Sequence, residues 1–214
     1  MEHVQEYPPP AAPSAYPPLA TRVSVIEPEY CYPQPVDLAV VREVLTISEG
    51  KFAVSDINGN IMFKIKGKIF SIHDRRLLTD AAGNPVCTLR HKVWGESTEE
   101  KDLIFTVKRS SMIQLKTKLH VFLATNPKEN VCDFKVEGSW LERSCIIYSG
   151  ESNTILAQVL NTLFLRTIDA QEAQFESVLL GKDKFMVAVY PNVDYAFVVA
   201  LIAILDGINH DDDE

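Results

Sequence analysis

The feature that most constrains the fold is an unbroken apolar run near the carboxyl end of the chain, residues 195–205. It has no polar face, and a helix that is apolar all round must be buried on every side. Eleven helical residues span about 16 Å, well short of a bilayer core of about 30 Å. We therefore favour burial of this helix inside protein, with a membrane anchor as the alternative.

Polar residues on both sides of the run suggest where the helix begins and ends. Asn192 can act as the N-cap, which places Asp194 in the first turn near the positive end of the helix dipole. Gly207 is a plausible stop. The residues predicted to form the buried central helix are Tyr195, Phe197, Val198, Leu201, Ile202 and Leu205.

The chain before this helix has the pattern of short β-strands. The segment 58–60, Asn-Gly-Asn, separates two alternating apolar runs and predicts a hairpin. In the second of these runs Phe63 and Ile65 should face one side, and Lys64 and Lys66 the other.

Similar runs continue to residue 190, and only residues 36–47 fit strand and helix equally well. Ten or more short strands at regular spacing are typical of a sandwich or a barrel. The predicted fold is mainly β, a closed antiparallel barrel of ten or more strands around the helix. Besides the ambiguous segment 36–47, the predicted strands are residues 51–56, 61–66, 69–72, 75–79, 86–90, 103–107, 115–122, 132–136, 145–148, 155–159, 178–180 and 184–190.

Composition divides the chain into a body and two tails. Nine of the twelve prolines and four tyrosines lie in residues 1–35, a composition that favours polyproline II or disorder. We predict a disordered Pro/Tyr-rich tail over 1–35, a single globular domain over 36–210 and an acidic tail over 211–214. The proline-rich tail could dock on a protein partner or simply be solvated.

The net charge of −8 argues against a general nucleic-acid binder, but the charge is unevenly distributed. Residues 64–118 hold 12 basic and 6 acidic groups, whereas residues 119–210 hold 6 and 11. A local basic face can therefore act on an anionic partner despite the overall sign.

The four cysteines, Cys31, Cys87, Cys132 and Cys145, form no C-x-x-C motif, and no histidine lies at metal-ligand spacing from them in the sequence. We interpret them as reduced, mostly buried thiols of an intracellular protein. The amino-terminal segment lacks the basic and apolar regions of a secretory signal.

Catalytic and cofactor motifs are absent from the sequence, which contains no G-x-S-x-G, P-loop, H-E-x-x-H or G-x-G-x-x-G. Cys145 as a nucleophile is a weak alternative to a core role. We therefore expect no enzyme activity, no cofactor and no metal site.

Several stretches carry a family resemblance that covers about residues 36–209. They are residues 52–60 with 63–67, 80–90, 101–105, 138–145, and 189–197 with 204–206. With these the chain resembles the plant LURP-one-related proteins, within the Tubby C-terminal-like group that also includes the phospholipid scramblases. The resemblance implies a twelve-stranded barrel threaded by the C-terminal helix.

The chain departs from the family pattern at two places. After Lys92 it is shorter than the family usually is, and over residues 161–174 it is longer. A truncated strand would expose sheet edges, so we expect reduced stability relative to family members with the full strand.

Tubby relatives bind phosphoinositide headgroups through basic side chains on the barrel surface, so the resemblance makes a basic patch the candidate site. Such a patch could equally be a solvated strand face. The predicted role is a non-enzymatic cytoplasmic monomer, peripheral at membranes or nuclear, that tethers reversibly to anionic phospholipid headgroups in plant defence. The alternative is a protein-interaction scaffold that acts through the Pro/Tyr-rich tail. The patch residues are Lys64, Lys66, Lys68, Arg75, Arg76, Lys108, Arg109, Lys116 and Lys118.

Overall fold

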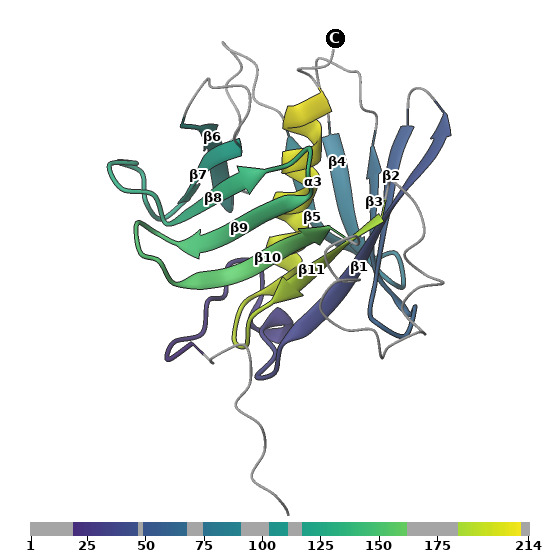
Figure 1. The fold of residues 1–214 in the computed structure, drawn as a ribbon, viewed down its shortest axis with the longest axis horizontal. Coiled ribbons are helices and arrows are strands. Elements are labelled where there is room, and N and C mark those ends of the chain that lie inside the picture. Colours follow the sequence, from purple (N-terminus) through teal and green to yellow (C-terminus); the bar gives the residue numbers. More distant parts are fainter. Residues whose placement is uncertain are drawn as a thin grey trace, which may run out of the picture.

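The computed structural model describes residues 19–46, 49–67, 75–90, 103–110, 117–161 and 184–210. Within these ranges the protein is mainly β, with one long helix at its carboxyl end (Figure 1). The predicted strands at 69–72 and 178–180, the short stretch after Lys92, most of the insert at 161–174 and the acidic tail lie outside the described residues.

In the described ranges, eleven antiparallel strands form one sheet in the order β5-β4-β3-β2-β1-β11-β10-β9-β8-β7-β6. The first and last strands of the domain, β1 and β11, pair in the middle of this order, with Val36 opposite Val189. The strands are β1 (Val36–Thr46), β2 (Glu49–Ser55), β3 (Ile61–Gly67), β4 (Arg75–Asp80), β5 (Pro85–Arg90), β6 (Phe105–Arg109), β7 (Thr117–Leu123), β8 (Phe134–Ser139), β9 (Ser144–Ser149), β10 (Ile155–Asn161) and β11 (Lys184–Val189).

The prediction of a mainly β fold with a C-terminal helix is confirmed. The closed barrel is not, because β5 and β6 are the two edges of the sheet among the described residues. The ambiguous segment at 36–47 is a strand, since β1 is paired on both sides, with β2 and with β11. The predicted hairpin is also present, and Gly59 occupies its turn with φ +84°, a backbone conformation that glycine adopts readily.

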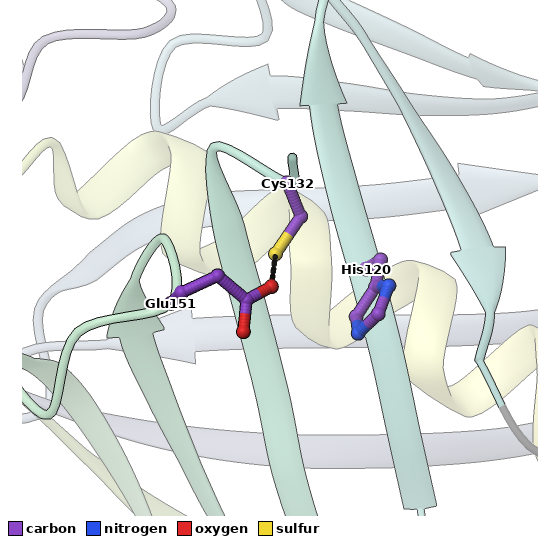
Figure 2. Close-up of side chains that lie close together, drawn as sticks. All are labelled: His120, Cys132 and Glu151. Carbon is purple, nitrogen blue, oxygen red and sulfur yellow. Dashed lines mark hydrogen bonds between the residues drawn. The ribbon is translucent and has the colours of Figure 1, made fainter. Parts of the chain in front are cut away.

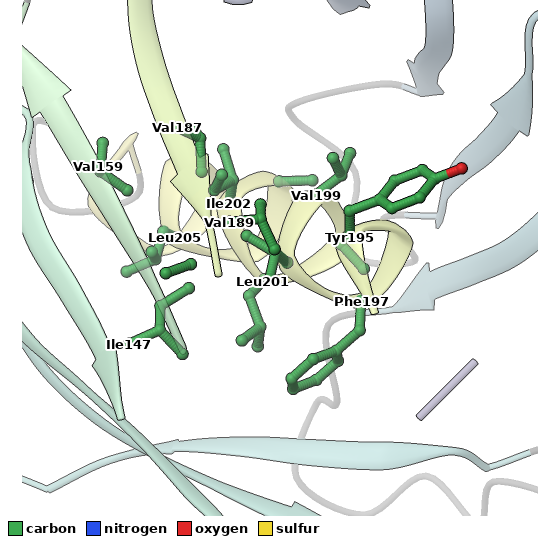
Figure 3. Packing of buried hydrophobic residues seen from close by; sticks show 14 of the residues in the cluster. Ile147, Val159, Val187, Val189, Tyr195, Phe197, Val199, Leu201, Ile202 and Leu205 are labelled. Atoms are coloured by element: carbon green, nitrogen blue, oxygen red, sulfur yellow. The ribbon is translucent and has the colours of Figure 1, made fainter. Parts of the chain in front are cut away.

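The helix α3 (Tyr195–His210) lies within the curve of the sheet (Figure 1). All six side chains singled out in the sequence are buried, and the exposed fraction of Phe197 and Leu205 is 0%. Their neighbours include Ile147, Val159 and Val187 from β9, β10 and β11 (Figure 3). Among the described residues, no helix combines the length and hydropathy needed to cross a membrane.

The N-cap of α3 is Asp194, which corrects the prediction of Asn192. The Asp194 carboxylate accepts a hydrogen bond from the Phe197 backbone N–H at 2.9 Å, and Asp194 is completely buried. Asn192 instead adopts a left-handed conformation with φ +67°, and its side-chain amide donates to the carbonyl of Leu19. Both Asn192 and Asp194 are of a residue type that caps helices. The left-handed backbone at Asn192 places the start of the helix after Asp194.

The same carboxylate also organises a segment that was predicted to be part of the disordered tail. One oxygen of Asp194 accepts hydrogen bonds from the backbone N–H groups of Val25, Ile26 and Glu27, at 3.1, 2.7 and 3.2 Å. A short 3₁₀ turn, η1 (Pro28–Tyr30), follows, and Tyr30 packs edge-on against Phe63. The folded part therefore extends upstream of Val36, because residues 19–35 cover the first turn of α3.

The other end of α3 also differs from the prediction. The helix continues through Gly207 to His210 instead of stopping at Gly207. A Cβ atom on Gly207 would lie 3.1 Å from the guanidinium of Arg76, which donates a 2.7 Å hydrogen bond to the carbonyl of Ala203. The glycine at this position gives the arginine room to reach the helix backbone.

We predict that Asp194→Ala lowers the free energy of unfolding by about 4 kcal/mol. The substitution removes a cap and leaves three further N–H groups without their charged acceptor. Urea unfolding followed by circular dichroism measures the loss. The Asp194→Asn variant retains one acceptor oxygen, so its free energy of unfolding should lie between those of the wild type and Asp194→Ala.

Asp56→Ala is the matched control. The Asp56 carboxylate also accepts four hydrogen bonds, from the backbone and side chain of both Asn58 and Asn60, but these residues are at the surface. Replacing Asp56 should lower the free energy of unfolding much less, since water can take the place of the carboxylate. Equal losses for the two alanine variants would contradict the role assigned to Asp194.

Candidate functional site

The interior of the protein is occupied by α3, so a functional site has to be sought on the outer face of the sheet. Large side chains from the helix and from both halves of the sheet meet in the interior. Phe197 packs against Phe134 of β8, and Tyr195 packs against Phe63 of β3. The residues of interest are therefore those that alternate with the core residues along each strand.

The lysines of β3 occupy such outward positions. Phe63 and Ile65 are buried, whereas Lys64 is partly exposed and Lys66 exposed. No ion pair or hydrogen bond engages either lysine side chain within the described part of the chain. Lys68 and the side chain of Arg75 lie outside the described residues.

The second group of predicted basic residues is held by partners on the protein. Lys108 on β6 pairs with Glu129, and Lys118 on β7 pairs with Glu137 across to β8 at 3.4 Å. The Arg109 guanidinium donates to the carbonyl of Ile208 near the end of α3. These cations are consequently less available to an anionic ligand than those of β3. Lys116 lies outside the described residues.

Arg76 does not belong to a surface patch at all. Its side chain is 11% exposed and lies 3.8 Å from the carboxylate of Asp206, which is 1% exposed. Together with the hydrogen bond to Ala203, this contact makes Arg76 a structural residue that neutralises the C-terminal end of α3. The sequence grouped Arg76 with Arg75 by adjacency, whereas Arg76 alternates along β4 in step with the buried core residue Leu78.

The structure also brings together three side chains that the sequence did not connect: His120, Cys132 and Glu151 (Figure 2). Their ligand-type atoms all lie within 4.8 Å of one another. His120 projects from β7, Cys132 precedes β8, and Glu151 lies in the turn between β9 and β10. The Cys132 thiol donates a 3.1 Å hydrogen bond to the Glu151 carboxylate.

Backbone hydrogen bonds hold the three segments of this cluster in place. The N–H of Asp133 donates to the carbonyl of Val121 at 2.9 Å, next to His120 and Cys132. The N–H of Gly150 donates to the carbonyl of Asp133 at 2.7 Å, next to Cys132 and Glu151. The three backbone segments that carry these side chains are therefore hydrogen-bonded to one another. The three residues are far apart in the sequence and meet only through strand pairing, so spacing along the chain could not reveal the cluster.

Burial raises the pKa of the Cys132 thiol to about 11, and the hydrogen bond and negative charge of Glu151 act in the same direction. The pKa of Cys145 is raised to about 12, again mainly by burial. Both thiols are therefore protonated at neutral pH, and neither has the depressed pKa of a catalytic nucleophile. All four cysteines are free, as predicted.

Comparison with known proteins places the chain in a well-defined group. The family model described as LURP-one-related matches residues 36–206. Protein LURP-one-related 15 of Arabidopsis thaliana is 47% identical over 98% of this chain and 97% of its own length. Protein LURP-one-related 10 of the same plant is 46% identical, over 90% of this chain and all of the relative.

A solved structure agrees with these matches. An X-ray structure of a protein from Arabidopsis thaliana is 43% identical in sequence and superimposes with a TM-score of 0.63. The superposition covers 87% of this chain and 98% of the other. The similarity therefore extends over nearly the whole chain.

We predict that Arg76→Ala lowers the free energy of unfolding by about 3 kcal/mol, because it removes a cationic partner from the buried carboxylate of Asp206. Lys66→Ala, on the exposed face of the neighbouring strand, is the control and should change stability by less than about 0.5 kcal/mol. Chemical denaturation of the two variants measures the difference. An Arg76→Ala protein as stable as the wild type would show that this contact is not structural.

Proposed function

The chain belongs to the LURP-one-related family of plant proteins, and on this premise we propose that it is a non-enzymatic module that attaches reversibly to anionic membrane surfaces. The observation that carries the proposal is the filled interior. Since α3 occupies the space that a ligand cavity would need, the available chemistry is that of the outer surface.

The membrane contact that we propose is the outward face of β3, with Lys64 and Lys66. Their ammonium groups alternate with the core residues Phe63 and Ile65 and so project together from one strand face. A lysine close to an anionic bilayer contributes about 1 kcal/mol, and salt screens that attraction over about 8 Å at physiological ionic strength. Two lysines give weak, reversible binding, to which Lys68 and Arg75 of the predicted patch would add.

We include in this proposal the Tubby-like closure of the sheet around α3. Arg76 of β4 and Arg109 of β6 come from the two outer regions of the strand order, and both donate to carbonyls in the last turns of α3. This arrangement supports a sheet that surrounds the helix. A role in plant defence rests on the family resemblance alone.

The competing hypothesis is a scaffold that recruits a protein through the Pro/Tyr-rich tail. The structure changes the experiment that separates the two hypotheses. Deleting residues 1–35 would remove the donors that bind Asp194, and so would damage the domain itself. Deleting residues 1–18 leaves those donors in place, and under our proposal it should leave vesicle binding unchanged.

We predict that the protein sediments with phosphatidylcholine vesicles that contain phosphoinositide, and that binding falls as salt is raised. The double variant Lys64→Ala/Lys66→Ala should bind roughly thirty-fold more weakly, from about 1 kcal/mol per lysine. Lys128→Ala, an exposed lysine in the β7–β8 connection, is the matched control and should bind normally. Salt-independent binding, or equal binding by the double variant and the control, would refute the proposed contact.

A further inference from the structure

We propose that His120, Cys132 and Glu151 form a binding site for Zn²⁺, with a water molecule as the fourth ligand. This site is independent of the proposed membrane contact, because it lies on the outer face at β7–β9 and involves none of the basic residues discussed above.

The donor set matches the chemistry of zinc. Imidazole nitrogen, thiolate sulfur and carboxylate oxygen are the three kinds of ligand that proteins use for Zn²⁺, and this cluster offers one of each. A site with a thiolate and an imidazole favours Zn²⁺ over Mg²⁺ and Ca²⁺, which prefer oxygen ligands. Three protein ligands with one open position are also a common zinc arrangement.

The geometry requires only small adjustments. Ligand atoms at 2.0–2.3 Å from a tetrahedral ion lie roughly 3.3–3.6 Å from one another. In the cluster the Cys132–Glu151 distance is 3.1 Å, and no separation exceeds 4.8 Å. Side-chain torsions that move the donor atoms by roughly 1 Å are sufficient. Glu151 is exposed and His120 partly exposed, so an ion can enter from solvent although Cys132 is buried.

The backbone around the cluster is already in position. The hydrogen bonds of Asp133 with Val121 and of Gly150 with Asp133 fix the three segments relative to one another. The His120 ring packs edge-on against Phe122, with the ring centroids 6.3 Å apart. Little backbone freedom is therefore left to lose when the ion binds.

The charges also balance. On binding, the Sγ–H bond of Cys132 breaks, its proton passes to solvent and a sulfur–zinc bond forms. The thiolate, the Glu151 carboxylate and the neutral imidazole then carry a total charge of −2, which the ion cancels. Two cations flank His120 in the strand register, Lys108 of β6 and Lys135 of β8. Lys108 is paired with Glu129, and the ammonium of Lys135 lies 5.0 Å from the centroid of the Tyr148 ring.

Titration of the chelator-treated full-length protein with Zn²⁺, in competition with a chromophoric chelator, tests the proposal. We expect one ion per chain with a dissociation constant below micromolar. Changing a residue that hydrogen-bonds to a metal ligand costs roughly 10–100-fold in metal affinity, and loss of a ligand itself should cost more. Cys132→Ser and His120→Ala should therefore each weaken binding by about 100-fold or more. Glu151→Gln should weaken it by a smaller factor, since one anionic ligand is lost.

Co²⁺ provides a direct readout of the ligands. The wild-type protein should develop a sulfur-to-metal charge-transfer band and the intense visible bands of tetrahedral cobalt, and Cys132→Ser should abolish the charge-transfer band. Cys87→Ser is the matched control, because Cys87 is a free thiol on β5 outside the cluster, and it should retain both signals.

Folding of each variant is checked by circular dichroism. Because Glu151 is exposed, Glu151→Gln should fold, and it tests the proposal even if Cys132→Ser does not fold. Zn²⁺ should also raise the melting temperature of the wild type more than that of the variants. Binding no tighter than millimolar, a wild-type Co²⁺ spectrum without a thiolate band, or Zn²⁺ affinity unchanged in both Cys132→Ser and Glu151→Gln would overturn the proposal.

Discussion

A helix without a polar face is stable in water only if other parts of the protein cover it on every side, and the rest of this structure follows from that requirement. Residues from Ala196 to Ala203 have at most 1% of their surface exposed, so no side of this stretch of α3 faces solvent. One layer of sheet can cover a single side of a helix, whereas a strongly curved sheet can cover most of its circumference. The long antiparallel sheet with β1 and β11 at its centre supplies that curved surface (Figure 1).

Enclosing the helix creates a second requirement, because its ends carry backbone groups that need partners away from bulk water. At the amino end Asp194 accepts hydrogen bonds from α3 and from residues 25–27 with the same carboxylate. At the carboxyl end Arg76 and Arg109 donate to helix carbonyls. An anion at the first turn and cations at the last turns also complement the helix dipole. Partners from three distant parts of the chain thus make the position of α3 depend on the complete fold.

Local patterns were sufficient to predict the helix and the described strands other than β1. The alternation around Phe63 and Ile65, the Asn-Gly turn and the apolar run after Asp194 each depend on neighbours in the sequence. The errors arose where the outcome depends on contacts distant in sequence. Gly207 has the composition of a helix stop, yet it lies inside the helix beside the guanidinium of Arg76 from β4. Arg76 has the charge of a surface residue, but Asp206 and Ala203 hold it inside. The cluster of His120, Cys132 and Glu151 was invisible for the same reason, since only the pairing of β7 to β10 brings it together.

The filled interior determines where this protein can have separate functions. In a barrel with an empty centre, a ligand would contact many strands at once, and most substitutions in its site would also disturb the core. Here the outward side chains alternate with buried ones, so Lys64 and Lys66 can change without removing Phe63 or Ile65 from the core. Glu151 lies in a surface turn and can likewise change while β9 and β10 keep their pairing. The inner face therefore maintains the fold and the outer face is free to bind. Because β3 and β7 lie in different halves of the strand order, an anionic surface and a metal ion would use different parts of that outer face.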